Sequence, residues 1–136
     1  MVYYLARLSY HPEMARETFT IEGAGAISLT AEAEGDAYAI PVLLAHGGGQ
    51  TRRAWRRVVS ELAQAGFRAI AFDMRGHGDS DWSPCGAYEM RDFAADLVAA
   101  ASRLDQKPAL VGASLGGLAG LIAAGELAQG SLASVP

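Results

Sequence analysis

The sequence LVGASLGG, residues 110–117, joins a short apolar run to a serine between glycines, and an alanine- and leucine-rich segment follows it. Residues 108–113 are typical of a buried strand, and residues 115–127 have the composition of a helix. Small neighbours let a chain turn sharply between two such elements, which leaves the Ser114 hydroxyl exposed above the strand end. G-x-S-x-G patterns also occur in ordinary turns. The position between a strand and a helix is what favours a nucleophile elbow.

Two similar units precede this stretch. Each has an apolar run, a glycine-rich polar loop and a segment with helical spacing: residues 40–45, 46–50 and 51–65 in the first unit, and 67–72, 73–80 and 90–104 in the second. Strands that alternate with helices predict βαβ units and a parallel sheet. Because ligands bind at the carboxyl ends of parallel strands, we expect the three polar loops to meet at one edge of the sheet.

The amino-terminal part has a different pattern. Residues 19–22 and 27–30 alternate between apolar and polar side chains and are separated by Gly-Ala-Gly, which predicts an antiparallel hairpin. Residues 1–17 show no clear period, and we expect them to form an arm. The sequence therefore predicts an α/β fold: a domain over residues 18–136, with five strands in a mostly parallel sheet and three flanking helices.

The composition of the chain excludes some classes of function. The chain has 136 residues, is 51% hydrophobic and 19% charged, and carries a net charge of -4, so it lacks the basic surface of a nucleic-acid-binding protein. Its single cysteine, Cys85, cannot form an internal disulfide, which fits a reducing compartment. Residues 1–7 lack the apolar core of a signal peptide. The cytoplasm is therefore the expected location.

The three loops together resemble the α/β-hydrolase superfamily, in its serine esterase- and lipase-like branch. The motifs HGGGQ, DxRGHGxS and GxSxGG carry this resemblance in their type, order and spacing. It implies that Ser114 is the nucleophile, that the amides of Gly48 and Leu115 form an oxyanion hole, and that the substrate is a small ester or related acyl compound. Gly48 has no side chain to obstruct a carbonyl, and Leu115 opens a helix whose first amides are unpaired. A serine in the elbow, rather than an aspartate, argues against epoxide hydrolases and haloalkane dehalogenases.

Four further residues are candidates for the pocket or for structuring its loops: His46, Gly47, His77 and Trp82. In the family, the positions of His46 and His77 structure the loops. A serine without a base is a poor nucleophile at neutral pH, so either histidine acting as the base is the less favoured alternative. His11 has no motif context.

The chain departs from the family after the nucleophile. The superfamily places its acid and then its histidine after the serine, whereas the 22 residues that follow Ser114 contain no Asp and no His, and Glu126 is their only carboxylate. We therefore expect an amino-terminal half that ends after the elbow helix and is an incomplete catalytic unit. The alternative is a catalytically silent interaction or assembly module.

The same departure leaves the strand at 108–113 without its outer neighbour. Uncovered strand edges are rare in folded proteins, so we expect a homodimer or a complementing carboxyl-terminal half to bury this edge. Residues 131–135 folding back as a covering strand are the other possibility.

The remaining charged features have plain explanations. The arginines of the first predicted helix are interpreted as a solvated face rather than as a site that steers anions: Arg52, Arg53, Arg56 and Arg57. Three aspartates lie in a glycine-rich turn, where capping and pairing with Arg75 are expected rather than a metal site: Asp73, Asp79 and Asp81. We predict no metal and no cofactor.

Residues 108–125 carry no charge and contain a G-x-x-x-G pattern, which a membrane span could also explain. Five glycines, a serine and many alanines make this segment only mildly hydrophobic. The strand-loop-helix interpretation is therefore preferred, and no membrane association is predicted.

Overall fold

A computed structural model describes residues 15–128 and confirms the predicted α/β fold. Its strands and helices follow in this order: β1 (Glu17–Glu22), η1 (Ala24–Ala26), β2 (Ser28–Glu34), β3 (Pro41–Ala45), η2 (Arg52–Trp55), α1 (Arg56–Gln64), β4 (Arg68–Phe72), α2 (Met90–Ser102), β5 (Ala109–Gly112) and α3 (Leu115–Ala128). Residues 1–14 of the expected arm and residues 129–136 lie outside the described range. The proposed covering strand at 131–135 therefore also lies outside it. Glu17 of the expected arm already belongs to β1.

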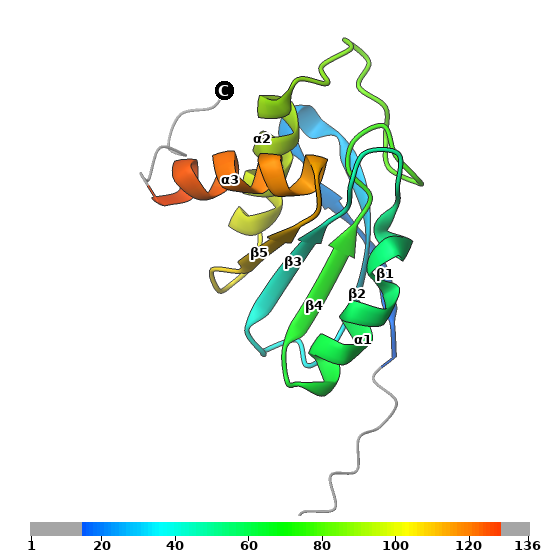
Figure 1. Cartoon of the computed structure of the whole chain (residues 1–136), viewed down its shortest axis with the longest axis vertical. Coiled ribbons are helices and arrows are strands. Elements are labelled where there is room, and N and C mark those ends of the chain that lie inside the picture. The colour runs from blue at the N-terminus through cyan, green and yellow to red at the C-terminus, as the bar shows by residue number, and fades with distance from the viewer. Residues whose placement is uncertain (1–14, 129–136) are drawn as a thin grey trace, which may run out of the picture.

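The five strands form one sheet in the order β1-β2-β4-β3-β5 (Figure 1). β3 is parallel to both β4 and β5, and the predicted hairpin of β1 and β2 joins β4 in antiparallel register. Ala45, the last residue of β3, pairs with Phe72 on one side and with Gly112 on the other. The three parallel strands therefore end level with one another, and the polar loops that follow them meet at one edge, as predicted.

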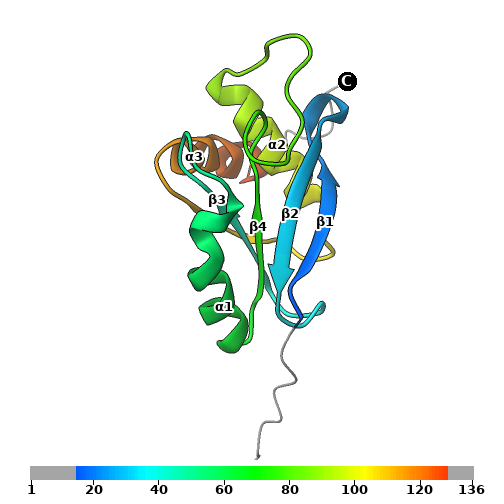
Figure 2. The same cartoon turned by 90° about the vertical axis from the view of Figure 1, so that its right-hand side faces the viewer.

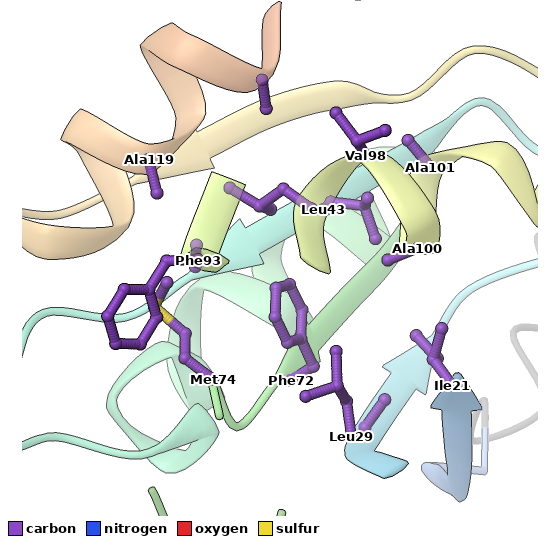
Figure 3. Packing of buried hydrophobic residues seen from close by; sticks show 14 of the residues in the cluster. Ile21, Leu29, Leu43, Phe72, Met74, Phe93, Val98, Ala100, Ala101 and Ala119 are labelled. Carbon is purple, nitrogen blue, oxygen red and sulfur yellow. The ribbon is translucent and has the colours of Figure 1, made fainter. Parts of the chain in front are cut away.

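Helices cover both faces of this sheet (Figure 1 and Figure 2). α2 and α3 lie against one face, where Phe72, Leu43 and Leu29 form the centre of the larger core (Figure 3). α1 lies against the other face over a smaller cluster of Val42, Leu44 and Val59. The strands β3 and β4 are apolar on both sides because they are buried on both sides.

The first predicted helix differs from the expectation at its start. Residues 52–55 form a 3-10 turn, and the α-helix begins only at Arg56. The cause is a tertiary contact: the backbone N–H of Arg52 donates to Oδ1 of Asp73 at 2.6 Å, which ties the first turn to the loop after β4. Gly66, at φ 92, follows the end of α1 and lets the chain reverse into β4.

The uncharged segment 108–125 forms β5, the turn after it and most of α3. Among residues 15–128, no helix combines the length and the hydropathy needed to cross a membrane.

Candidate active site

Ser114 occupies the turn between β5 and α3. Its φ is 48°, in the left-handed region that residues with a β-carbon rarely adopt, and its side chain is exposed. Both features match the nucleophile elbow predicted from the glycine flanks. The turn is secured on both sides, because the Ala113 N–H donates to the Ala45 carbonyl at 3.1 Å and the Leu118 N–H donates to the Ser114 carbonyl at 2.9 Å.

The two glycines that flank Ser114 allow backbone to touch backbone. A β-carbon on Gly112 would overlap the peptide between Gly116 and Gly117. A β-carbon on Gly116 would overlap the carbonyl group of Ala45 at the end of β3. Only glycine fits at these two positions, so the start of α3 packs directly on the sheet edge.

The HGGGQ loop after β3 is held by side chains at two of its three glycines. The Gly47 N–H donates to Oε1 of Gln50 at 3.0 Å, and the Gly49 N–H donates to Nε2 of His77 at 3.2 Å. Within residues 15–128, the Gly48 N–H makes no hydrogen bond. A β-carbon on Gly48 would lie 3.9 Å from the side chain of Leu115, so Gly48 faces the start of α3.

Leu115 is the first residue of α3, and its N–H likewise has no acceptor in the described part of the chain. The amides expected to form the oxyanion hole are therefore unpaired and belong to facing backbone segments. The role of Gln50 was not predicted, although the residue belongs to the motif.

Both candidate histidines are engaged by the loops. His46 is fully buried; its Nε2 accepts from the Met74 N–H at 3.0 Å, and its Nδ1 lies 2.8 Å from the Gly47 carbonyl oxygen. His77 accepts from Gly49 through Nε2, and its Nδ1 lies 2.9 Å from the Arg75 carbonyl oxygen. Burial lowers the pKa of His46, which favours its neutral form.

Neither ring keeps a free Nε2 lone pair for a proton from Ser114. The loop-structuring interpretation of His46 and His77 therefore agrees with their contacts. His11 lies outside the described residues.

Asp73 organises the loop after β4 from a fully buried position. It accepts from the Arg52 backbone and guanidinium and from the Asp79 N–H at 2.9 Å. Arg52 also pairs with Asp79 at 2.8 Å and with Glu32 at 3.0 Å. The prediction of a solvated arginine face is therefore wrong for Arg52, which is buried among three carboxylates, whereas the other three arginines are exposed: Arg53, Arg56 and Arg57.

Arg75 pairs with a residue that the sequence did not single out. Its guanidinium donates to both oxygens of Asp96 on α2, each at 2.7 Å, and both side chains are buried. The predicted pairing of Arg75 with the turn aspartates is therefore wrong in its partner. Asp96 lies on the apolar face of α2 and belongs to no motif. No cluster of His, Cys, Asp and Glu within residues 15–128 is arranged to hold a metal ion.

The two tryptophans have different surroundings. Trp82 lies in the loop after β4 and is 75% exposed, so its side chain is available to a ligand at this edge. Trp55 packs against the cluster beneath α1, as expected for a core residue.

Comparison with known proteins agrees with this geometry. Residues 40–135 match the family described as alpha/beta hydrolase fold. The chain belongs to the α/β-hydrolase family. This match includes all three motif loops.

Individual α/β-hydrolases match with moderate identity. A non-heme chloroperoxidase of Streptomyces lividans is 37% identical over 79 residues, which are 57% of this chain and 28% of that protein. An epoxide hydrolase of Vigna radiata superposes with a TM-score of 0.73 at 28% identity, over 79% of this chain and 35% of that one. A thioesterase domain from the curacin biosynthetic pathway gives a TM-score of 0.74 at 31% identity, over 83% of this chain and 41% of that one. The chain thus spans between 28% and 41% of these three proteins.

Proposed function

We propose that this α/β-hydrolase chain provides the nucleophile and the oxyanion hole of a serine hydrolase that acts on carboxylic esters or related acyl substrates. One observation carries the proposal: Ser114 is exposed at a φ of 48°, and Gly48, whose N–H is unpaired within residues 15–128, faces the residue that follows it. An exposed hydroxyl beside unpaired amides is the arrangement that acyl transfer requires.

In the proposed reaction, Oγ of Ser114 bonds to the substrate carbonyl carbon while its proton passes to a base. The carbonyl oxygen becomes an oxyanion that accepts from the N–H groups of Gly48 and Leu115. The start of α3 adds the positive end of a helix dipole at the same place. The C–O bond to the leaving alcohol then breaks as the base returns the proton to it, and water hydrolyses the acyl-serine in a second cycle of the same kind.

The serine side chain supports acyl chemistry over epoxide opening. The relatives include an epoxide hydrolase and a thioesterase domain, so family membership alone leaves the reaction open. Ser114 stands where resemblance to epoxide hydrolases would require an aspartate. We therefore propose ester or thioester-like substrates, handled as small molecules without a cofactor, in a cytoplasmic setting.

We further infer that the general base comes from outside residues 15–128, because His46 and His77 both use Nε2 as a backbone acceptor. Hydrolysis of p-nitrophenyl acetate by this chain should then be slow, about 10³-fold above the uncatalysed rate, as in proteases that have lost their triad. This residual rate comes from the oxyanion hole and from binding, so Ser114→Ala should change it little while no base is supplied. The nucleophile is tested by covalent modification instead, and a Ser114 that a fluorophosphonate leaves unmodified would contradict it. Fast turnover lost in Ser114→Ala would contradict the external base, and His46→Ala and His77→Ala would then identify it.

A specific observation favours an assembly module as a second candidate. Within residues 15–128, β5 forms one edge of the sheet, and three large apolar residues of β5 and α3 are exposed: Val111, Leu118 and Leu121. A groove of about 600 Å³ opens between the ends of α2 and α3 next to this strand. We propose that a second copy or a complementing carboxyl-terminal half covers this edge. In light scattering, a monomer with slow amide exchange at Leu110 and Val111 would exclude that assembly.

A further inference from the structure

The loops after β3 and β4 are joined twice by imidazole rings, in opposite directions. His46 belongs to the first loop and accepts from the Met74 N–H of the second at 3.0 Å. His77 belongs to the second loop and accepts from the Gly49 N–H of the first at 3.2 Å. The two rings meet edge to face, with their centroids 5.0 Å apart.

These contacts define the protonation of both rings. Each Nε2 faces a backbone N–H, which can only donate, so each Nε2 must carry a lone pair. Each Nδ1 faces a carbonyl oxygen, which can only accept: that of Gly47 for His46 and that of Arg75 for His77. Both rings are therefore neutral and protonated on Nδ1, with every ring nitrogen satisfied.

Hydrogen bonds to side chains occupy two of the three glycine N–H groups in the HGGGQ loop and leave the third without a partner among residues 15–128. The N–H groups on either side of Gly48 are both taken, that of Gly47 by Gln50 and that of Gly49 by His77. Gly49 has a φ of 74° and no neighbour within 4 Å of a β-carbon position, so side-chain packing does not hold it. Its hydrogen bond to His77 therefore holds the carboxyl side of this loop together with the turn bond from the Gln50 N–H to the Gly47 carbonyl at 3.1 Å.

We propose that His46 and His77 form a reciprocal imidazole clamp that aims the Gly48 N–H at the substrate oxygen, with His77 as the positioning residue that holds the loop only while its ring is neutral. This inference rests on the proposed oxyanion role of Gly48. A proton on Nε2 of His77 would place two donors against each other at Gly49 and release the loop on that side.

His77 has the more open surroundings of the two rings. It is half-buried, whereas His46 is fully buried and its pKa is lowered by that burial. Ionisable groups near the clamp include His46 itself, Asp73 and Asp79, which both pair with Arg52, and Arg75, whose carbonyl contacts the His77 ring. From α2 the apolar ring of Phe93 approaches His77, with centroids 6.4 Å apart.

Two variants of the full chain test the clamp. His77→Gln keeps an acceptor oxygen for the Gly49 N–H but does not titrate, and His77→Leu removes the acceptor. In 15N-labelled protein, His77 should show a protonated Nδ1 and an unprotonated Nε2, and the Gly49 amide shift should move in His77→Leu but stay near its wild-type value in His77→Gln. Amide exchange at Gly49 should be about tenfold faster in His77→Leu than in His77→Gln, with exchange at Leu43 and Phe72 unchanged.

A His77 ring protonated on Nε2, or equal Gly49 exchange in the two variants, would overturn the clamp. The rate at which a fluorophosphonate modifies Ser114 tests whether the clamp positions the Gly48 N–H. This rate should be about tenfold lower in His77→Leu than in the wild type, and within about threefold of the wild type in His77→Gln. Equal rates in all three proteins would overturn the positioning role. A wild-type Ser114 that does not react would contradict the nucleophile proposal, while the Gly49 amide would still decide whether the clamp exists.

Discussion

Gly116, in the first turn of α3, lies against the carbonyl group of Ala45 so closely that a β-carbon would overlap it. Gly116→Ala should therefore lower the free energy of unfolding by about 2 kcal/mol or more, since neither backbone segment can move without disturbing the sheet. Urea unfolding followed by circular dichroism measures this loss.

Gly120→Ala, one helical turn further on, is the matched control. No atom lies within 4 Å of a β-carbon position there, so the better helix propensity of alanine should raise stability by about 0.5–1 kcal/mol. Equal effects of the two substitutions would show that α3 does not pack on β3 as described.

The backbone of Ser114 is expected to be strained. At a φ of 48°, a residue with a β-carbon costs about 1 kcal/mol relative to glycine. Ser114→Gly should therefore be more stable than Ser114→Ala by about that amount, as measured by denaturant unfolding at one pH. A more stable alanine variant would contradict the left-handed turn.

The buried pair of Arg75 and Asp96 should matter greatly to stability. Asp96→Ala leaves the buried guanidinium without a counter-charge, with the carbonyls of Ala24 and Ala87 as its remaining partners, and should cost about 3–5 kcal/mol, whereas replacing both partners with Met and Leu should recover part of the loss. The exposed pair of Arg57 and Glu61 is the contrast, and Arg57→Ala should cause no measurable change in unfolding. Similar losses in the two cases would contradict the burial of the inner pair.

The strands and helices were predicted from the sequence more accurately than the contacts between them. The three polar loops were expected at one edge because parallel strands end together, and the pairing of Ala45 with Phe72 and Gly112 confirms it. The order of the strands was not predicted, because alternation within residues 19–30 shows a hairpin but not the strand it joins. That β2 pairs with β4 depends on contacts between distant residues.

Side-chain partners were harder to predict for the same reason. Arg52 looks like one of four exposed arginines, and only the folded loop brings it to Asp73, 21 residues later. Asp96 looks like a polar interruption in an apolar helix until Arg75 reaches it. The strained serine was predictable because its cause is local, in the glycines two residues away on each side.

Stability should depend on pH through His46. Burial lowers its folded-state pKa below the ordinary value of 6.5, so the unfolded chain takes up a proton first as the pH falls. The stabilising contribution is complete above pH 6.5 and is lost as the pH falls from there towards the folded-state pKa, with a slope of up to about 1.4 kcal/mol per pH unit. His46→Gln should reduce the slope of unfolding free energy against pH in this window. An unchanged slope would show that His46 titrates normally in the folded protein.

The proposed role of Ser114 is tested most directly by covalent trapping. The chain is incubated with a fluorophosphonate, which substitutes phosphorus for the acyl carbon and places an oxygen in the proposed oxyanion hole. Peptide mapping by mass spectrometry then locates the adduct. We predict one phosphonyl group on Ser114, formed slowly and absent from folded Ser114→Ala. An unmodified Ser114 after prolonged incubation, or an adduct on another residue that forms equally fast in Ser114→Ala, would contradict it.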